Sequence, residues 1–250
     1  MKLAGLQKLT LLDYPGQLAC TVFTQGCNLR CPFCQNADLV LPERFGGCDL
    51  LEEDTFFSFL ESRKGRLNAV AVSGGEPTLH ADLPRFLKRI REMGFLVKLD
   101  TNGTNPQMLE SVMEEGLVSY VAMDVKNTPE KYALTCGYAA GSAASHMLES
   151  VQRSLEYLRK DTVPYELRTT VVGGLHTQED IVCMAKWLQG VRAWYLQQFI
   201  PSEQMVGFPG EDGAGQAQQP LDLHAPAAQQ LLDMCAAAAE YVPSVQVRGI

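Results

Sequence analysis

Hydrophobic positions follow two different spacings along most of the chain. From about residue 18 to 199, short apolar and β-branched runs alternate with longer amphipathic stretches. Short runs of this kind predict strands, and the longer stretches predict helices. The expected strands are Leu18–Gln25, Ala69–Ser73, Phe95–Asp100, Tyr120–Val125, Tyr165–Val172 and Trp194–Ile200. The expected helices are Leu51–Lys64, Ala81–Met93, Pro106–Glu115, Ser145–Arg159 and Thr177–Leu188.

This alternation amounts to about six βα units. Strands joined through helices pair in parallel, and the helices cover the sheet. Because a closed barrel of eight units usually takes about 250 residues, six units plus tails predict an α/β fold of the open, partial parallel (β/α)6 barrel type. We expect one domain with its core at about 11–201. A Gly- and Gln-rich loop at about 202–224 follows, and residues 225–250 form a C-terminal helix (Ala227–Glu240) and a short β-like tail (Val245–Arg248).

Charge and composition narrow the function classes. The chain has 21 Lys and Arg against 29 Asp and Glu, a formal charge of −8, which argues against nucleic acid as the main partner. No apolar run approaches the ~18 residues of a membrane span, and the first residues have no signal-peptide pattern. We therefore expect no membrane partner, a cytoplasmic location and reduced thiols.

Three of the eight cysteines lie within eight positions, as Cys27, Cys31 and Cys34. Their C-x3-C-x2-C spacing follows the first expected strand, so one loop can wrap a metal centre. Thiolates select zinc, copper(I) or iron–sulfur clusters. A [4Fe–4S] cluster with three protein ligands fits this spacing better than a structural zinc site, which takes four closed ligands. Zinc and coincidence remain open from spacing alone.

Other polar motifs come at the ends of later strands, where parallel α/β sheets gather their reactive groups. Gly74-Gly75-Glu76 ends one strand, and by itself it would also suit a plain strand-to-helix turn. Asp100 and Asn102 follow the next strand, as an Asx-type turn would. Asp124 and Lys126 follow the one after, as a solvated charge pair would. Arg168 lies on the fifth strand, where a strand-edge arginine is the plainer interpretation.

Together these motifs resemble the radical S-adenosylmethionine enzymes, whose C-x3-C-x-aromatic-C loop is matched here with Phe33 as the aromatic residue. The resemblance implies one [4Fe–4S] cluster on Cys27, Cys31 and Cys34, with S-adenosylmethionine on the fourth iron. It also implies that Gly74, Gly75 and Glu76 hold the methionyl amino group. Reductive cleavage of S-adenosylmethionine in that superfamily gives methionine and a 5′-deoxyadenosyl radical.

The activases of glycyl radical enzymes are the most similar group within that superfamily. Asp13-Tyr14-Pro15-Gly16 and the segment from Phe23 to Asn36 match their D-x-P-G, F-x-Q-G-C and C-x-x-C-x-N patterns, and the resemblance runs from about residue 11 to 201. It implies that Asn36 and Phe33 lie near the cofactor and that Asn102 belongs to its site. Asp100 and Asp124 would hold a monovalent cation, Lys126 would face the substrate, and Arg168 would lie on the cofactor side.

The activating proteins of anaerobic ribonucleoside-triphosphate reductase are the expected subgroup. Such a protein makes a glycyl radical on that reductase and takes its electron from a donor such as flavodoxin or ferredoxin. Two departures matter: no ferredoxin-like insert precedes Gly74, so one cluster is expected, and Gln35 replaces a common histidine. The alternatives are a pyruvate formate-lyase-type activase, a radical enzyme acting on a small molecule as 7-carboxy-7-deazaguanine synthase does, and a non-enzymatic iron–sulfur or zinc module.

Overall fold

The computed structural model describes residues 1–47, 50–139, 141–203, 205–207 and 222–250. Within these residues eight strands form one sheet whose order follows the chain from β1 to β8. The strands are β1 (Leu3–Thr10), β2 (Ala19–Thr24), β3 (Ala69–Gly74), β4 (Leu96–Thr101), β5 (Tyr120–Asp124), β6 (Tyr165–Val171), β7 (Trp194–Gln198) and β8 (Val245–Arg248). The α-helices are α1 (Ala37–Val40), α2 (Glu53–Arg63), α3 (Leu83–Glu92), α4 (Pro106–Glu114), α5 (Tyr132–Thr135), α6 (Ser142–Leu158), α7 (Gln178–Trp187) and α8 (Ala228–Ala239). Two 3-10 helices are η1 (Pro42–Gly47) and η2 (Pro77–Leu79).

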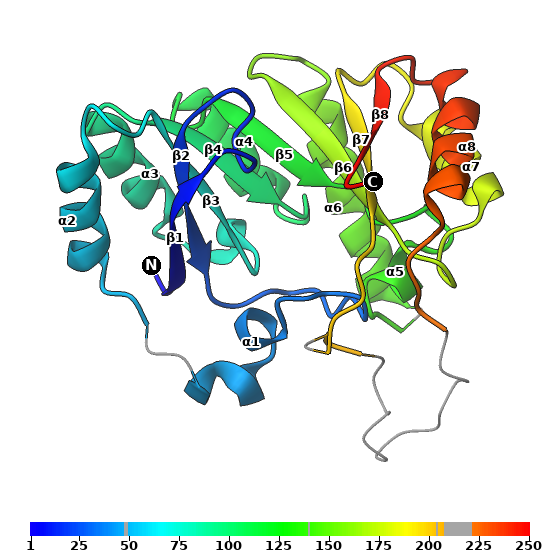
Figure 1. Cartoon of the computed structure of the whole chain (residues 1–250), viewed down its shortest axis with the longest axis horizontal. Helices are drawn as coiled ribbons and strands as arrows, with labels where there is room; N and C mark the ends of the chain where they lie inside the picture. Colours follow the sequence, from blue (N-terminus) through cyan, green and yellow to red (C-terminus); the bar gives the residue numbers. More distant parts are fainter. Residues whose placement is uncertain (48–49, 140, 204, 208–221) are drawn as a thin grey trace.

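The strands β2 to β8 run parallel to one another, and β1 pairs antiparallel with β2. This open, mostly parallel α/β sheet confirms the predicted fold class, and the six predicted strands are β2 to β7. The sheet is larger than predicted because the β-like tail is β8 and because β1 lies before the predicted core. In Figure 1 these two strands are the blue and red edges of the sheet. Most of the predicted loop at about 202–224 lies outside the described residues.

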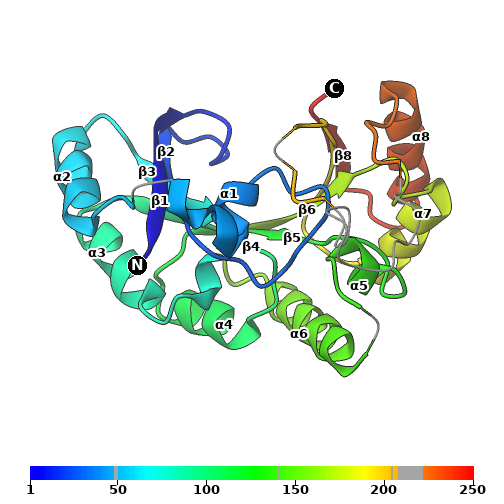
Figure 2. The ribbon, with the colours of Figure 1, turned by 90° about the horizontal axis from the view of Figure 1, so that it is seen from below.

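The helices α2, α3, α4, α6, α7 and α8 lie along the outer face of the curved sheet, whereas α1 lies apart from them (Figure 2). Because successive side chains of a strand point to opposite faces, every second residue packs against those helices. Val72 of β3, Leu99 of β4, Val121 of β5, Leu167 of β6 and Leu196 of β7 are all fully buried in this outer core. Burying such side chains contributes about 1.5–3 kcal/mol each, so the outer face stabilises the fold.

The inner face of the sheet carries the alternate residues, which include small and charged side chains. Ala71 of β3 and Ala122 of β5 are buried there, and Lys98 and Asp100 of β4 line a cavity over this face. The β1–β2 loop reaches over the same face, where the Tyr14 ring contacts that of Tyr120 with centroids 5.7 Å apart. The inner face therefore forms a lined cavity in place of a packed core.

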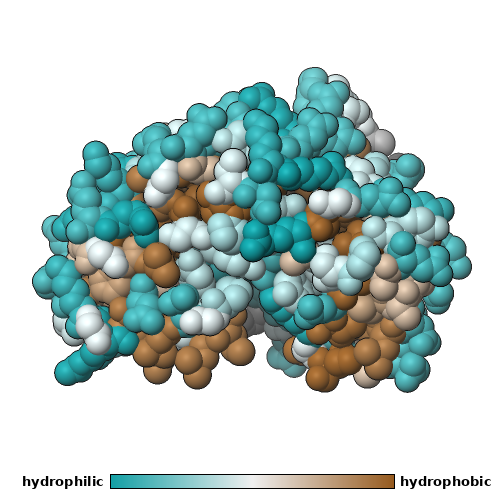
Figure 3. Space-filling view, turned by 90° about the horizontal axis from the view of Figure 1, so that it is seen from above, coloured by the Kyte–Doolittle hydropathy of each residue, from teal (hydrophilic) through white to brown (hydrophobic). Residues whose placement is uncertain are grey.

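The cavity is not enclosed by strands on every side, since β1 and β8 are separate edges of the sheet. The space-filling view in Figure 3 shows a notch between two lobes, with apolar surface on both. Leu11 and Leu12 of the β1–β2 loop and Ile200 after β7 line the cavity and remain 72%, 88% and 64% exposed. The wall of the cavity thus includes apolar groups that are open to solvent.

Candidate active site

One cavity of about 900 Å³ runs along the inner face of the sheet to the carboxyl ends of its parallel strands. This volume lies within the range of small-molecule and cofactor sites. The site residues predicted from the sequence all line it: Cys27, Cys31, Phe33, Cys34, Asn36, Gly74, Gly75, Glu76, Asp100, Asn102, Asp124, Lys126 and Arg168. Residues up to 141 positions apart in the chain are thus brought to one surface, because parallel strands place their carboxyl ends together.

The loop after β2 carries the three cysteines, and the segment after α5 fixes it. The backbone N–H of Arg30 donates to the carbonyl of Cys136 at 2.9 Å, and the Tyr138 hydroxyl donates to the carbonyl of Asn28 at 2.8 Å. Between them Gly137 has a φ of +74°, and a Cβ at this position would collide with the carbonyl of Arg30. The loop is therefore positioned by a segment more than 100 residues away in the chain.

The three thiols lie in different surroundings. Burial, reinforced by the negative charge of Glu76, raises the pKa of Cys27 to about 12, and burial raises the pKa of Cys34 as well. The pKa of Cys31 is lowered, because its sulfur is hydrogen bonded to the thiol of Cys136. Without a metal, then, the loop holds Cys27 and Cys34 as protonated thiols.

The donor set fits an iron–sulfur cluster by its chemistry. Three thiols of one short loop line one wall of the cavity, and thiolates are the ligands that such clusters take. Metal binding removes the protons that burial retains on the thiols. As they stand, no three Cys, His, Asp or Glu side chains in the described part of the chain are grouped closely enough to hold a metal ion. A [4Fe–4S] cluster does not need that grouping, because each thiolate binds a different iron.

The turn after β3 is attached directly to the start of the cysteine loop. Gly75 N donates to the carbonyl of Thr24 at 2.9 Å, and Glu76 N donates to the carbonyl of Gly26 at 2.8 Å. Gly74 has a φ of +121°, and a Cβ on either Gly74 or Gly75 would collide with this backbone. Two glycines are needed here because the two backbones approach without room for a side chain.

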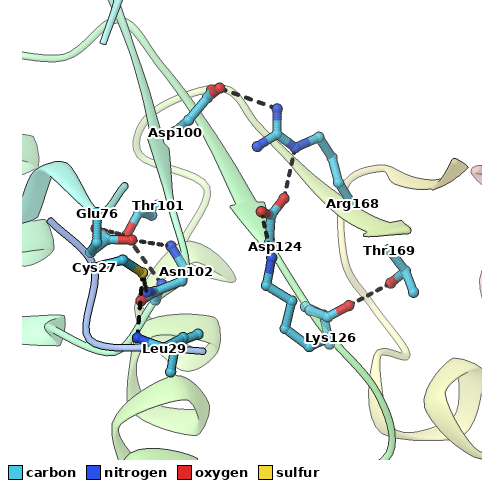
Figure 4. A network of polar contacts seen from close by, with 12 residues as sticks. Cys27, Leu29, Glu76, Asp100, Thr101, Asn102, Asp124, Lys126, Arg168 and Thr169 are labelled. Atoms are coloured by element: carbon cyan, nitrogen blue, oxygen red, sulfur yellow. Dashed lines mark hydrogen bonds and ion pairs between the residues drawn. The ribbon is translucent and has the colours of Figure 1, made fainter. Parts of the chain in front are cut away.

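Glu76 is the most strongly hydrogen-bonded carboxylate of the site (Figure 4). Its Oε1 accepts from Thr78 N at 3.1 Å, from Thr78 Oγ1 at 2.6 Å and from Thr101 Oγ1 at 2.8 Å. Its Oε2 accepts from Asn102 N at 2.6 Å, which leaves this oxygen capacity for one further donor. Burial nevertheless raises the pKa of Glu76 above its usual value. An ammonium group at Oε2 would restore the charged form.

Asn102 connects this carboxylate to the cysteine loop. Its Nδ2 donates to Asn28 Oδ1 at 3.0 Å and lies 3.8 Å from Cys27 Sγ. Phe33 packs edge-on against Phe199, with ring centroids 6.4 Å apart, and Asn36 Nδ2 donates to the Gly74 carbonyl at 3.5 Å. The predicted cofactor residues are therefore neighbours in space, while their binding roles remain predictions.

A second group of charges crosses the sheet from β4 to β6. The Arg168 guanidinium lies between two carboxylates, with Nη1 3.3 Å from Asp100 Oδ2 and Nε 2.9 Å from Asp124 Oδ1 (Figure 4). Lys126 Nζ lies 2.9 Å from Asp124 Oδ2, and Lys98 Nζ contacts Asp100 Oδ1. The result is an alternating row of three cations and two anions, which we call the charge ladder.

The pKa values of the charge ladder shift in the directions that opposite charges produce. Burial opposes the charged forms, yet Arg168 and Lys98 lower the pKa of Asp100, and Arg168 and Lys126 lower that of Asp124. In turn the two carboxylates raise the pKa of Arg168, and Asp124 raises the pKa of Lys126. All four groups are charged at neutral pH, so Lys126 acts as a fixed cation and not as a proton donor.

The described residues give no support to the predicted monovalent cation near Asp100 and Asp124. The Arg168 guanidinium occupies the space between the two carboxylates, and a lysine contacts each from its other side. Within this row of charges the three positive groups outnumber the two negative ones, which opposes a further cation. The cation therefore stays a prediction, while Asp100 and Asp124 do line the cavity.

Sequence reasoning missed three residues that position the site. Lys98 is a buried lysine within β4, and its place two residues before Asp100 was a visible signal of a cavity-facing pair. His176 donates through Nε2 to the carbonyl of Lys126 at 2.8 Å, because its Nδ1 accepts from Val172 N at 3.1 Å. Cys136 lies beside Cys31. No local pattern marks His176 or Cys136, since their contacts come only from the fold.

Comparison with known proteins decides the family. The profile of the radical SAM superfamily matches residues 21–188. The chain belongs to the radical SAM superfamily. A proposed glycyl-radical enzyme activating enzyme of Methanocaldococcus jannaschii is 32% identical to it over 204 residues, covering 80% of each chain. A pyruvate formate-lyase-activating enzyme of Streptococcus mutans is 25% identical over 207 residues, covering 79% of this chain and 75% of that one.

Solved structures agree on the fold of this radical SAM protein. A structure of TYW1 with a lysine–pyruvate adduct bound matches 89% of this chain and 73% of its own, with a TM-score of 0.59 and 15% identity. At that identity the match concerns the fold alone. Membership of the radical SAM superfamily implies a [4Fe–4S] cluster and S-adenosylmethionine as cofactors. In the described residues, no helix is long and apolar enough to cross a membrane.

Proposed function

We propose that this radical SAM enzyme is an activase that makes a glycyl radical on a partner enzyme, and that the partner is anaerobic ribonucleoside-triphosphate reductase. When bound, the cluster and S-adenosylmethionine supply a 5′-deoxyadenosyl radical after one electron arrives from an external donor and methionine is released. That radical takes the α-hydrogen of a partner glycine, which leaves 5′-deoxyadenosine and a glycyl radical. Atoms and electrons balance with one electron consumed per turnover.

One observation carries the proposal. The cysteine loop, the Gly74–Glu76 turn and the motifs at Asp100–Asn102 and Asp124–Lys126 all line a single cavity. The edge of this cavity is apolar and open to solvent. Leu11 and Leu12 lie on one edge of the sheet and Ile200 near the other, and all three are exposed. An extended segment of a protein could enter beside these side chains and bring a backbone Cα–H to the inner face. A glycine inside a helix or a sheet could not approach in this way.

The chain's own residues have separate roles in this proposal. Cys27, Cys31 and Cys34 hold the cluster, and Glu76 Oε2 accepts the methionyl ammonium group beside the Gly74–Gly75 turn. Phe33 and Asn36 bound the cofactor on the cysteine-loop side, and Asn102 orders Glu76 and Cys27 together. Lys126 and Arg168 provide fixed positive charge toward the cofactor carboxylate and the substrate.

Two relatives support the activase class, since the archaeal protein and the streptococcal enzyme are both named as activating enzymes. The reductase as partner, flavodoxin or ferredoxin as electron donor, anaerobic use and a cytoplasmic location are further parts of the proposal. They rest on the resemblance of Asp13–Gly16 and Phe23–Asn36 to the activating proteins of that reductase.

The test is anaerobic and has two steps. The protein is reconstituted with iron and sulfide, reduced with dithionite and given S-adenosylmethionine, and 5′-deoxyadenosine is measured by chromatography. The reductase is then added, and an organic radical is sought on it by electron paramagnetic resonance. We expect product in the first step and a glycyl radical in the second. The Cys27→Ala protein, treated in the same way, is the control for both.

The outcomes separate the alternatives. A radical on pyruvate formate-lyase but not on the reductase would keep the activase class and change the partner. Product without a radical on any glycyl radical enzyme would favour a small-molecule substrate. A reduced cluster that yields no product even with the reductase present would point to a carrier or scaffold and contradict the proposal.

A further inference from the structure

The charge ladder departs from the cation site that the activase resemblance predicts. A monovalent cation binds to carboxylate or carbonyl oxygens, and positive charge beside those oxygens opposes its binding. Asp100 Oδ1 instead contacts Lys98 Nζ, Asp124 Oδ2 has Lys126 Nζ at 2.9 Å, and the remaining oxygen of each faces Arg168. Every oxygen of the two carboxylates thus has a cationic partner from the chain.

Lys98 is the member of this ladder that has no part in the predicted site. It lies in the middle of β4 and is 1% exposed, and its Nζ contacts the carboxylate two residues ahead on the same face. The strand register places Ala71 of β3 and Tyr120 of β5 beside it. The small side chain of Ala71 leaves room for the lysine stem on the inner face. A buried ammonium group without a carboxylate beside it would destabilise the fold. The Lys98–Asp100 ion pair is therefore a structural part of the cavity.

Ser73 completes the arrangement, because its Oγ donates to Asp100 Oδ2 at 3.0 Å. Asp100 therefore accepts from Lys98 of β4, Ser73 of β3 and Arg168 of β6. These contacts fix the carboxylate on the inner face. One positive charge is left over in the charge ladder as a whole, and it suits the carboxylate of an amino-acid cofactor.

We propose that the Lys98 ammonium takes the place of a monovalent cation, so that the cofactor site works without sodium or potassium. Lys98 is then a positioning residue, which acts through Asp100. The inference rests on one part of the proposed function, namely that S-adenosylmethionine binds in this cavity. It does not depend on the identity of the partner enzyme.

The test compares the wild type with Lys98→Met in NaCl, KCl and choline chloride at equal ionic strength. Melting temperature is measured on the protein without cluster or cofactor, and S-adenosylmethionine affinity is measured on the reconstituted protein. For the wild type we expect the same values in all three salts. For Lys98→Met we expect a melting temperature about 3 °C higher with sodium or potassium than with choline, and an affinity about tenfold higher.

Lys131→Met is the matched control, because Lys131 Nζ pairs with Asp180 Oδ2 at 2.7 Å outside the cavity. This variant loses a lysine–aspartate ion pair whose lysine is 42% exposed, and we expect no difference between the salts. If Lys98→Met does not fold, Lys98→Gln replaces it, and the wild-type measurement still applies.

Two results would overturn the proposal. One is a wild type whose melting temperature or affinity rises specifically with sodium or potassium. The other is a folded Lys98 variant that responds to no cation. Absence of S-adenosylmethionine binding in every salt would instead contradict the proposed function, while the melting temperatures would still decide the role of Lys98.

Discussion

The outer and inner faces of the sheet are built by the same strands and differ in almost every physical respect. On β4, Leu99 is fully buried among apolar side chains under the helices, whereas its neighbours Lys98 and Asp100 form an ion pair over the cavity. The outer face stabilises the fold by burial, and the inner face holds charges in fixed positions. Adjacent residues of one strand therefore serve different purposes, one stabilising the fold and the other lining the functional site.

The largest expected effect comes from the cysteine loop, where function should be lost without loss of the fold. Cys27→Ala, Cys31→Ala or Cys34→Ala should each abolish the cluster, measured as bound iron and sulfide after reconstitution, and change the melting temperature little. Cys183→Ser is the control, because Cys183 is exposed on α7 outside the cavity. A full cluster in any of the three alanine variants would remove the central assignment.

A change on the outer face should have the opposite outcome. Leu99→Ala removes a fully buried side chain and should lower the free energy of unfolding by about 2–5 kcal/mol, measured by urea denaturation. Where the variant is folded, its affinity for S-adenosylmethionine should equal that of the wild type. A folded Leu99→Ala protein with much weaker cofactor binding would show that the two faces are coupled.

Arg168→Met tests the inner face alone. The change leaves Asp100 and Asp124 without their shared partner. Because these side chains are 14% and 30% exposed, water offsets part of the cost, and we expect a loss of about 2 kcal/mol of stability. Affinity for S-adenosylmethionine should fall at least about tenfold. Unchanged affinity, measured by equilibrium dialysis of the reconstituted protein, would contradict a cofactor-side role for Arg168.

The smallest expected effect is a pH dependence from His176, which holds the backbone of Lys126 at the edge of the cavity. Burial lowers the pKa of His176 below its usual value of 6.5. The unfolded chain therefore binds a proton at this residue more readily than the folded protein does. Stability from this group is present above pH 6.5 and is lost as the pH falls below it. His176→Gln should reduce this loss in urea denaturation between pH 8 and pH 5.

His80 must be separated from His176 in that experiment, because burial lowers its pKa too. The His80→Gln protein measures its share of the pH dependence. If His176→Gln changes the pH dependence of the free energy of unfolding no more than His80→Gln does, burial of His176 does not control that pH dependence.

The strands of the outer core could be predicted closely from the sequence. Tyr120–Val125 and Tyr165–Val172 were each one residue longer than β5 and β6, because buried parallel strands are continuous apolar runs. The strand β1 was missed because residues 7 to 9 are exposed and most of the others are only half-buried. An edge strand of this kind carries no strong hydrophobic pattern.

The cavity residues were predictable in kind but not in their pairing. Motif spacing identified the residues that line the cavity, since parallel strands bring their ends together. Which cation faces which carboxylate could not be predicted, because Arg168 meets Asp100 across 68 positions of the chain. The cation expected near Asp100 and Asp124 has no support in the structure, because Lys98, two residues before Asp100, and Arg168 of β6 already contact these carboxylates.

The sheet order has a consequence for how the protein is made. Every strand pairs with the one before it in the chain, so a ribosome that synthesises residues one after another can release the strands in the order in which they pair. Arg248 of β8 arrives after the other strands, and only then does buried Glu166 of β6 gain its bidentate partner, with contacts of 3.0 and 2.8 Å. Until β8 is in place, Glu166 lacks this cationic partner in the wall of the cavity.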